Sequence, residues 1–331
     1  MPPSLENRSV LVTGAGGFIG SHLVEGLLRA GAKVTALVRY NARSQIGNLD
    51  FVDPALASGL TIRFGNIEDP DFVRRLVEGQ DIVMHLAALI GIPYSYVSPR
   101  SYVATNITGT LNILEAVREM GVARVINTST SEVYGTPATT PIAEDHPLQG
   151  QSPYSASKIA ADKLAEAYHR SFETPVVTLR PFNTFGPRQS ARAFIPTIIS
   201  QALAGDAVRL GALTPRRDLT YVGDTVDAYL KAAVTPGLAG ETIQLGVGEA
   251  HSVGEIAERI LALMGLQRRI EHDPGRDRPQ ASEVMTLISD NSLARRRLGW
   301  APTTSLDEGL RRSIQFIADH RDLYPASAYL V

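Results

Sequence analysis

Cysteine is absent from this 331-residue chain, and its absence excludes several kinds of site. Without a thiol there is no disulfide, no thiolate metal site and no cysteine nucleophile. Histidine is present but scattered. His85, His146 and His251 show none of the spacings that bind a metal ion, so we expect no metal.

Long apolar runs and an excess of either charge are also missing. Lysine and arginine total 32 against 34 acidic residues, and the net charge of −2 creates no overall field for nucleic acid or an anionic membrane. No apolar run reaches membrane-spanning length, and the polar residues 1–8 lead straight into a strand, which leaves no room for a signal peptide. We therefore expect a cytoplasmic protein with no nucleic-acid and no membrane partner, in which local positive groups bind any anionic ligand.

Glycines are concentrated near the N-terminus, between a short apolar strand and an amphipathic helix. The strand covers residues 9–12, and the helix extends to Ala30. Gly14, Gly17 and Gly20 have the spacing that allows a tight turn, close approach of backbone to a pyrophosphate, and close packing of helix on sheet. The helix N-terminus then offers free N–H groups and a positive dipole end to the phosphates. This segment predicts a dinucleotide site.

The second strand, residues 33–38, is followed by a basic residue where an acidic one is usual. In NAD-binding proteins an aspartate or glutamate at this point accepts hydrogen bonds from the adenosine ribose. This chain has Arg39 there, and an arginine suits a 2′-phosphate through charge-assisted hydrogen bonds. We therefore predict NAD(P) as the cofactor, with NADP favoured over NAD. The alternative is that Arg39 only stacks on the adenine.

Strands and helices alternate through the first half of the chain. Apolar segments typical of strands cover residues 61–64, 81–86 and 124–127, and a helix covers residues 98–120. This alternation indicates an α/β fold with a Rossmann doubly wound parallel sheet, whose ligands bind at the carboxyl ends of the strands. The segment Ala87-Ala88 follows one strand, and its small side chains would let a cofactor pass close to the backbone.

A tyrosine and a lysine are spaced four residues apart at the start of an alanine-rich amphipathic helix. Tyr154 and Lys158 share one face of that helix, so both can point into one cleft. Because a nearby ammonium favours the phenolate, we predict that Lys158 lowers the pKa of Tyr154 and makes it a usable proton acceptor. The alternative is a plain surface helix that carries a tyrosine and a lysine.

Four motifs follow one another along the chain and together resemble a known family. They are Gly14-x-x-Gly17-x-x-Gly20, Thr130-Ser131-Glu132-Val133-Tyr134-Gly135, Tyr154-x-x-x-Lys158 and Arg180-Pro181-Phe182-Asn183. In this combination the chain resembles the extended short-chain dehydrogenase/reductase family that acts on nucleotide sugars, which includes 4-epimerases, 4,6-dehydratases and UDP-glucuronate decarboxylases. Residues 92–96, 129–135 and 183–192 look closest to the GDP-N-acetylglucosamine 4,6-dehydratases of legionaminic acid biosynthesis.

The resemblance implies a reversible hydride transfer at carbon 4 of a nucleotide-diphosphate sugar. Tyr154 would take the proton of the 4-hydroxyl, Thr130 would hydrogen-bond the same oxygen, and Lys158 would bind the cofactor ribose. Asn106 would be the family's structural asparagine, which bonds backbone near the active site; the alternative is a helix residue bonded locally. The implied cofactor contacts are Gly14, Gly17, Phe18, Ile19, Gly20, Arg39, Asn66, Ile67, Leu86, Ala87, Ala88, Asn106, Tyr154, Lys158 and Pro181.

Ser131 and Glu132 occupy two positions whose residues differ between the enzymes of the family that this chain resembles. There a glutamate at the second position removes the proton on carbon 5, which the 4-ketone has acidified, and loss of the 6-hydroxyl gives a 4-keto-6-deoxy sugar. Dehydratases of the dTDP-glucose type carry Asp-Glu here, so in this chain Glu132, a water or another side chain must protonate the leaving hydroxyl. The predicted catalytic set is Thr130, Ser131, Glu132, Tyr154 and Lys158.

The favoured function is therefore a 4,6-dehydratase, with GDP-N-acetylglucosamine as the substrate that the resemblance suggests. The alternatives are a UDP-glucuronate decarboxylase, in which Ser-Glu also occurs, and a 4-epimerase. An apolar or small residue is usual at the position of Glu132 in epimerases, which argues against simple epimerisation. A non-catalytic dinucleotide sensor is a further alternative from a different class.

The second half of the chain departs from the alternation and should form a smaller C-terminal α/β substrate-binding lobe. We divide the chain into a dinucleotide-binding domain, residues 1–182, and a sugar-nucleotide-binding lobe, residues 183–331, with some chain crossing back. Arginine suits a diphosphate because its planar fork meets phosphate oxygens in pairs. The predicted substrate contacts are Thr130, Asn183, Arg192, Arg217 and Arg278.

Two helices carry apolar residues on more than one face and so need a second partner. The first includes Ile107 and Leu111, and the second includes Leu164 and Ala167. Relatives in the resembling family form dimers through a four-helix bundle made from these two helices. We therefore predict a homodimer.

Overall fold

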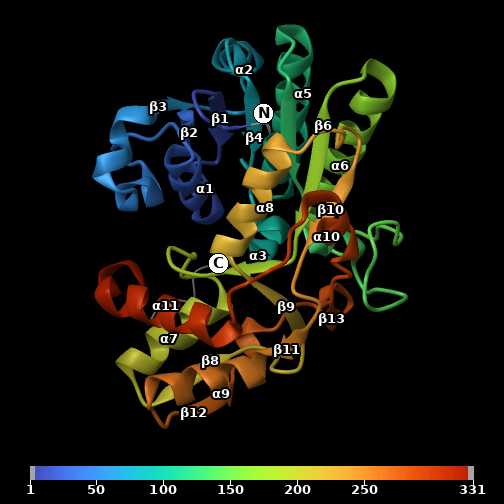
Figure 1. The fold of residues 1–331 in the computed structure, drawn as a ribbon. Helices are drawn as coiled ribbons and strands as arrows, with labels where there is room; N and C mark the ends of the chain where they lie inside the picture. Colours follow the sequence, from blue (N-terminus) through green and yellow to red (C-terminus); the bar gives the residue numbers. More distant parts are fainter. Residues whose placement is uncertain (1–3, 327–331) are drawn as a thin grey trace.

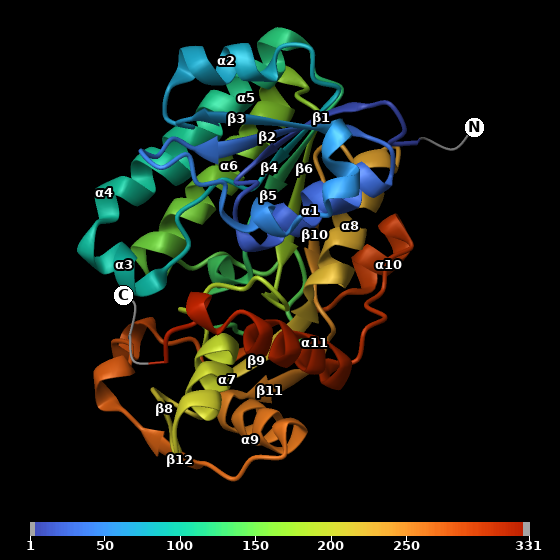
Figure 2. The same ribbon diagram turned by 90° about the vertical axis from the view of Figure 1, so that its left-hand side faces the viewer.

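Seven parallel strands form the central sheet of the protein (Figures 1 and 2). The structure is a computed structural model and describes residues 4–326. Across the sheet the strands lie in the order β3 (Leu60–Gly65), β2 (Lys33–Arg39), β1 (Ser9–Thr13), β4 (Ile82–His85), β5 (Arg124–Thr128), β6 (Val176–Pro181) and β10 (Thr242–Leu245). The direction of chain progression reverses between β1 and β4, and ligands of open parallel sheets bind beyond the carboxyl ends of the strands at such a reversal. The predicted doubly wound α/β fold is confirmed.

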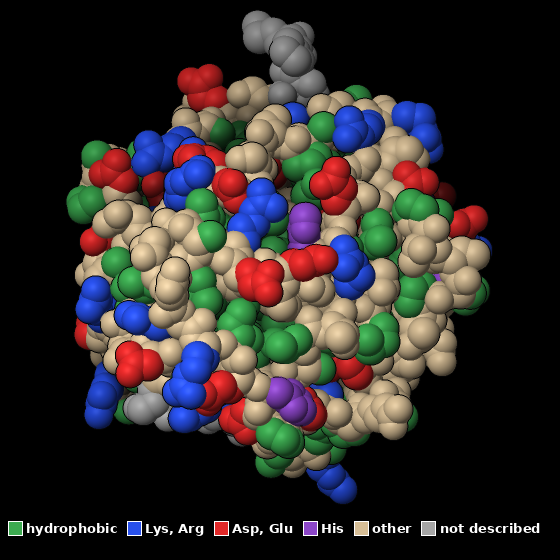
Figure 3. All heavy atoms as spheres, turned by 90° about the horizontal axis from the view of Figure 1, so that it is seen from below, with side chains coloured by type: hydrophobic (Ala, Val, Ile, Leu, Met, Phe, Trp, Pro, Cys, Tyr) green, Lys and Arg blue, Asp and Glu red, His purple; other side chains and the backbone are tan. Residues whose placement is uncertain are grey.

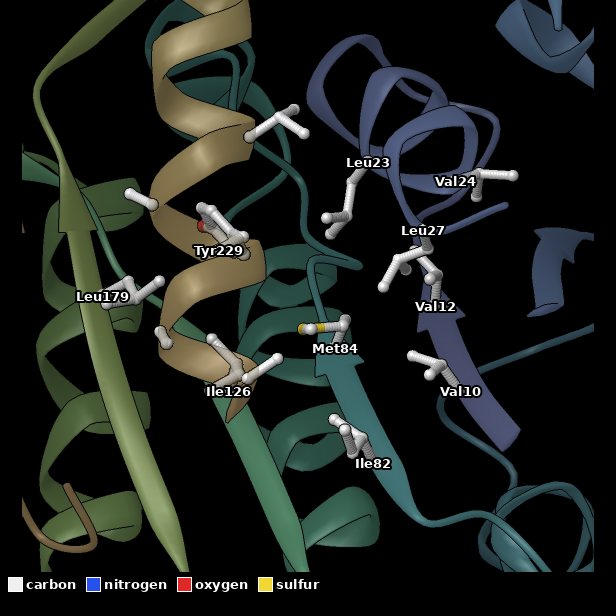
Figure 4. Close-up of a cluster of buried hydrophobic side chains, with 14 of the residues drawn as sticks. Val10, Val12, Leu23, Val24, Leu27, Ile82, Met84, Ile126, Leu179 and Tyr229 are labelled. Carbon is white, nitrogen blue, oxygen red and sulfur yellow. The ribbon is translucent and has the colours of Figure 1, made fainter. Parts of the chain in front are cut away.

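Helices cover both faces of this sheet. One face carries α1 (Phe18–Arg29), α8 (Val222–Val234) and α10 (Ser292–Leu298), and the other carries α2 (Pro70–Val77), α5 (Gly109–Met120) and α6 (Pro153–Phe172). Side chains alternate along each strand, so Val10 and Val12 pack with the first group of helices and Leu11 with the second. Figure 4 shows the first core, where Leu27 of α1 and Tyr229 of α8 meet strand side chains.

A second lobe lies beyond the carboxyl ends of the strands (Figure 2). It contains β7 (Asn183–Phe185), α7 (Phe194–Ala204), β8 (Ala207–Leu210), β9 (Arg216–Tyr221), β11 (Ala250–Ser252), α9 (Val253–Met264), β12 (Arg269–His272), β13 (Thr286–Leu287) and α11 (Leu306–Asp319). Strand β9 pairs in parallel with β7 and β13 and antiparallel with β11, while β8 pairs with β12. Between these segments α8 and β10 return to the first sheet, and the division of the chain after residue 182 stays a prediction.

The helix predicted over residues 98–120 is present, but it is not a regular α-helix. After α3 (Ile92–Val97) and α4 (Pro99–Tyr102), the chain makes a π-helical turn, Val103–Thr108, and continues as α5. A π turn inserts an extra residue and re-aims the side chains within it, and such turns are frequent at functional sites. Here the turn contains Asn106.

The surface shows no dominance of one charge on the face seen in Figure 3. Acidic and basic side chains are interspersed there, in keeping with the net charge of −2. Among residues 4–326, no helix combines the length and the apolar character needed to cross a membrane.

Candidate active site

A cavity of about 1260 Å³ lies between the carboxyl ends of the strands and the second lobe. Its wall combines residues that follow β1, β2, β4 and β5 with residues of α7, β8 and β9. Small-molecule sites usually occupy roughly 300–1000 Å³, so this cavity has room for a dinucleotide and a second ligand. The two lobes therefore share one site.

The structure brings every predicted site residue except Asn106 to the wall of this cavity. They are Gly14, Gly17, Phe18, Ile19, Gly20, Arg39, Asn66, Ile67, Leu86, Ala87, Ala88, Thr130, Ser131, Glu132, Tyr154, Lys158, Pro181, Asn183, Arg192, Arg217 and Arg278. A place at the wall permits contact with a ligand, while the individual roles stay predictions. Within residues 4–326, no group of three or more histidine and acidic side chains is arranged to hold a metal ion.

The glycine turn after β1 allows close approach of a ligand to the backbone. Gly14 has a φ of +69°, and a Cβ atom there would lie 2.8 Å from the backbone nitrogen of Ala87. A Cβ atom on Gly20 would overlap the carbonyl oxygen of Gly14, so α1 can pack against the turn only without a side chain at this point. Gly17, the N-cap of α1, has no side chain to occupy the N–H groups of the first turn. These N–H groups fit the pyrophosphate of a dinucleotide.

A buried chain of hydrogen bonds lies behind this turn. The Thr13 hydroxyl oxygen accepts from two backbone N–H groups of the segment after β4, at 3.1 and 3.0 Å, so its proton goes to His85 Nδ1 at 2.9 Å. On the other side of the ring, His85 Nε2 donates to Thr110 Oγ1 at 3.0 Å, and the Thr110 proton goes to the carbonyl of Asn106 at 2.7 Å. Burial lowers the pKa of His85 to about 3, so the ring is neutral and the tautomer is fixed by its partners.

Asn106 lies behind the cavity wall, which corrects its prediction as a cofactor contact. Its side chain is 1% exposed, accepts from the N–H of Leu89 at 2.8 Å, and donates to the Leu89 carbonyl and to Ser157 Oγ, both at 2.9 Å. Ser157 in turn donates to the carbonyl of Tyr154 at 2.7 Å. Asn106 therefore joins the segment after β4 to the start of α6, which is the backbone role that the resemblance implies.

Tyr154 and Lys158 both reach the cavity from α6, but their charge balance differs from the prediction. Burial raises the pKa of Tyr154, against a hydrogen bond with Thr130 that lowers it, and the negative charge of Glu132 raises it further. Lys158 Nζ donates to the carbonyl of Thr128 at 2.6 Å, and burial lowers the pKa of this lysine. The pKa of Tyr154 is therefore raised and not lowered as predicted, and burial is the main cause.

Glu132 presents a carboxylate to the cavity without a hydrogen bond or ion pair to any other residue in the range 4–326. It lies in the 3₁₀ turn Ser131–Tyr134, whose N-cap is Thr130. The Thr130 hydroxyl oxygen accepts from the backbone N–H of Glu132 at 3.2 Å, so one residue fixes the turn and also meets Tyr154. Ser131 is 3% exposed.

Two of the predicted substrate arginines already lie against a carboxylate, that of Glu283. Arg217, which is 6% exposed, donates from Nη2 to Glu283 Oε1 at 2.9 Å and from Nη1 to the Val284 carbonyl at 2.7 Å. Arg278 Nη1 lies 3.7 Å from the same carboxylate oxygen and makes no hydrogen bond within the described chain. Asn183 Oδ1 is also buried with no donor from residues 4–326. Buried atoms without partners at a cavity wall are available to a polar ligand.

Glu283 was missed by the sequence prediction. It lies at the cavity wall five residues after Arg278, just past a short 3₁₀ turn in an otherwise irregular segment. A single acidic residue in a loop has no periodicity to mark it, and only the fold shows that it meets Arg217. Asp162, also missed, did carry a signal, because it follows Lys158 by four residues on the same helix face.

The doubly wound sheet, the glycine turn and the Tyr154–Lys158 pair define the short-chain dehydrogenase/reductase class. Over residues 11–313 the chain matches the family described as GDP-mannose 4,6 dehydratase. It is 37% identical over 323 residues to a dTDP-glucose 4,6-dehydratase from Streptomyces griseus, with 94% of each chain covered. It is 33% identical over 312 residues to a UDP-glucose 4-epimerase from Mycolicibacterium smegmatis, covering 92% of this chain and 97% of that one.

A solved structure with the same fold is that of the UDP-glucuronic acid 4-epimerase from Bacillus cereus in complex with UDP-glucuronic acid and NAD. The TM-score is 0.87 at 30% identity, and the match covers 94% of this chain and 99% of that one. The chain therefore belongs to the extended short-chain dehydrogenase/reductase family of nucleotide-sugar dehydratases and epimerases.

The buried histidine behind the turn makes folding sensitive to acid. A pKa of about 3 in the folded protein against 6.5 unfolded means that the unfolded chain binds the extra proton first. This contribution to stability is complete above pH 6.5 and is lost as the pH falls toward 3. We expect His85→Gln to reduce the loss of unfolding free energy between pH 7.5 and 5 by about 2 kcal/mol, because 1.36 kcal/mol accompanies each pKa unit.

Urea denaturation at the two pH values measures this difference. His22, whose pKa burial lowers to about 4, is present in both proteins and cancels from the comparison. An equal loss of stability on acidification in wild type and in the His85→Gln variant would show that His85 is not the group responsible.

Proposed function

We propose that this protein is a nucleotide-sugar 4,6-dehydratase that acts on GDP-N-acetylglucosamine. The observation that carries the proposal is the carboxylate of Glu132, which stands at the cavity wall beside Thr130 and Tyr154 and has no hydrogen bond or ion pair to residues 4–326. A 4-epimerase only removes and returns hydride at carbon 4 and has no use for a base at carbon 5. A dehydratase needs that base. A cytoplasmic location is part of the same proposal.

The first step oxidises carbon 4. Tyr154 accepts the proton of the 4-hydroxyl while Thr130 hydrogen-bonds the same oxygen. A nicotinamide bound in this cavity would supply the hydride acceptor and, in its oxidised form, a positive charge that favours the phenolate against the effect of burial. Lys158 uses one of its three donors on Thr128 and has the others for the ribose hydroxyls.

The second step eliminates water. The 4-ketone acidifies the hydrogen on carbon 5, and Glu132 removes it as a proton. As the C6–O bond breaks, the oxygen takes that proton from Glu132 and leaves as water. We assign both transfers to Glu132 because a serine hydroxyl is too weak an acid to replace the aspartate of the dTDP-glucose type. Return of the hydride to carbon 6 and of a proton to carbon 5 completes a 4-keto-6-deoxy sugar with no net oxidation.

The substrate diphosphate would lie between the lobes, against the guanidinium groups of Arg217 and Arg278. Both arginines line the cavity, and Arg278 Nη1 lacks a hydrogen-bond partner among residues 4–326. Asn183 and the exposed Arg192 stand at the same wall and would bind sugar or phosphate oxygens. The assignment of guanine and an N-acetyl group to the substrate depends on the resemblance of residues 92–96, 129–135 and 183–192. The identity of the substrate is therefore tested directly.

We expect wild-type protein to remove water from GDP-N-acetylglucosamine, and Glu132→Gln to abolish that loss while leaving transient reduction of the cofactor. Removing a general base costs a factor of about 100 to 10,000. The protein is incubated with GDP-N-acetylglucosamine, UDP-N-acetylglucosamine, dTDP-glucose and UDP-glucuronate, and product masses show loss of water, loss of carbon dioxide or no change. Reduced nicotinamide is followed by absorbance.

Glu258→Gln is the control, since Glu258 is an exposed glutamate that does not line the cavity, and it should keep water loss near the wild-type rate. Loss of carbon dioxide from UDP-glucuronate would establish the decarboxylase instead. An unchanged mass with every substrate, together with exchange at carbon 4, would establish an epimerase. Dehydration by Glu132→Gln at the wild-type rate would show that Glu132 is not the base.

We propose NADP as the preferred cofactor because of Arg39. This residue ends β2 at the cavity wall, its side chain is exposed, and its guanidinium has no hydrogen bond or ion pair to residues 4–326. The following loop is held separately by Asn41, which accepts from the N–H of Gln45 at 2.9 Å and donates to the Gln45 carbonyl at 2.9 Å. Arg39 is therefore free to meet a 2′-phosphate.

Arg39→Ala should weaken NADP binding by about 10- to 100-fold, the equivalent of the roughly 1.5–3 kcal/mol of a hydrogen bond to a charged group, and should leave NAD binding nearly unchanged. Isothermal titration with each cofactor measures both constants. Arg43→Ala is the matched control, since Arg43 is exposed in the same loop but does not line the cavity. An equal loss for NAD and NADP would mean that Arg39 stacks on the adenine.

We also propose a homodimer built from α5 and α6. These helices pack against each other on one face of the sheet, where Ile113 and Leu114 are buried, while Leu111 and Leu164 are only half-buried. Apolar side chains left half-covered along two neighbouring helices suit a second copy of the same pair.

Light scattering at micromolar concentration should give twice the chain mass of 35.7 kDa. Ala167→Glu places a charge on the exposed face of α6 and should shift the protein to monomer, whereas Leu323→Glu, at another exposed apolar position, should not. Monomeric wild-type protein under these conditions would refute the dimer.

A further inference from the structure

Helix α6 carries a third ionisable side chain in line with the proposed catalytic pair. Tyr154, Lys158 and Asp162 follow one another at intervals of four residues, so they lie on one face of the helix. Asp162 is 5% exposed and does not line the cavity that holds the other two. The proposed reaction uses Tyr154 and Lys158 but gives no role to this buried carboxylate.

Three donors converge on the Asp162 carboxylate. Ser129 Oγ donates to Oδ2 at 2.6 Å, Arg180 Nε donates to Oδ2 at 3.1 Å, and Asn127 Nδ2 donates to Oδ1 at 3.4 Å. Arg180 is itself 5% exposed, so the ion pair between the two side chains is buried. The guanidinium and the two neutral donors hold the Asp162 carboxylate in one position.

The hydrogen bonds of Asp162 hold its carboxylate away from direct contact with Lys158. On its far side Arg180 Nη1 donates to Tyr134 Oη at 3.0 Å and to the Glu144 carbonyl at 3.2 Å, which anchors the guanidinium. Lys158 and Asp162 make no ion pair, and Lys158 Nζ donates to the Thr128 carbonyl instead. Asp162 therefore acts on Lys158 through its field and leaves the remaining ammonium donors free.

Apart from Glu132, which stands at the cavity wall and acts on Tyr154, the other titratable groups described around Lys158 carry no negative charge. His85 from β4 is neutral, because burial lowers its pKa to about 3. Burial raises the pKa of Tyr154 on α6 and of Tyr229 on α8, whose hydroxyl donates to Thr128 Oγ1 at 2.9 Å, so both phenols are neutral. Arg180 on β6 is positive and lies beyond Asp162. Asp162 is the charged group that opposes the effect of burial on the pKa of Lys158.

We propose that Asp162 is a positioning residue whose clamped carboxylate keeps the buried Lys158 ammonium charged and ready to bind the cofactor. Burial favours the neutral amine and lowers the pKa of Lys158, and the nearby Asp162 carboxylate opposes this effect. The consequence for catalysis rests on the function proposed above for Lys158. The charge state of Lys158 does not depend on that function and can be measured by itself.

The sequence suits a direct measurement, because it contains only four lysines: Lys33, Lys158, Lys163 and Lys231. Protein labelled with ¹³C at the lysine ε-carbon gives one resonance for each, and Lys158→Arg identifies the one of interest. Its titration is followed by nuclear magnetic resonance in wild type, in Asp162→Asn and in Glu166→Gln. The last is the matched control, since Glu166 lies one turn further along α6, is half exposed and pairs with Lys163 and Arg170.

We expect Asp162→Asn to move the midpoint of Lys158 down by about one pH unit or more, and Glu166→Gln to leave it in place. The pH above which the protein loses cofactor affinity should fall by the same amount in Asp162→Asn only. An unchanged Lys158 midpoint in folded Asp162→Asn protein would overturn the proposal.

A second measurement covers the case in which Asp162→Asn does not fold. Wild-type Lys158 must then remain charged at pH 8, and Asp162→Glu, which keeps the charge, must preserve that behaviour. A neutral Lys158 at pH 8 in wild type would overturn the proposal as well. Failure of the dehydration assay together with the expected titration would refute the proposed function and leave the role of Asp162 standing.

Discussion

The attachment of α6 to the end of β5 is the constraint on which the site depends. Lys158 bonds the carbonyl of Thr128, and Asp162 accepts from the hydroxyl of Ser129, so two consecutive residues at the end of one strand hold one helix face. The chain then passes directly into Thr130 and the turn that carries Glu132. Because buried hydrogen bonds join β5, this turn and α6, the backbone positions of Tyr154 and Glu132 are held close together.

Burial also affects the charge of Tyr154 and Lys158, the two residues of α6 that line the cavity. It raises the pKa of Tyr154 and lowers that of Lys158, so in both cases it favours the neutral form. If the buried Lys158 is to stay charged, it needs a nearby negative charge. If the buried Tyr154 is to lose its proton, it needs a nearby positive charge. Asp162 meets the first need from within the protein. In the proposed reaction, the positive ring of an oxidised nicotinamide bound in the cavity would meet the second need.

Much of this could be predicted from the sequence, because the signals were local or periodic. The alternation of segments predicted the doubly wound sheet. The glycine spacing predicted a tight turn, and in the structure a Cβ atom on Gly14 would meet Ala87. The four-residue interval placed Tyr154 and Lys158 at one cavity. All of these depend on neighbours along the chain.

What could not be predicted depends on contacts between distant segments. The pKa of Tyr154 depends on how completely other segments of the chain bury its side chain, and the spacing of residues in the sequence does not indicate that. The π-helical turn that contains the buried Asn106 was not predicted, since its residues read as an ordinary helix. Glu283 meets Arg217 across 66 residues of sequence in the second lobe. Such pairs are fixed by tertiary structure alone.

The position of Glu132 limits the stereochemistry of the proposed elimination. A single carboxylate that takes the proton from carbon 5 and passes it to the oxygen on carbon 6 must reach both from one side of the sugar. The 3₁₀ turn capped by Thr130 fixes that side, and the neighbouring Ser131 offers no stronger acid from another direction. The hydrogen and the hydroxyl must therefore leave from the same face. A second acid on the opposite face would be needed for them to leave from opposite faces, and the assignment of both proton transfers to Glu132 leaves no place for one.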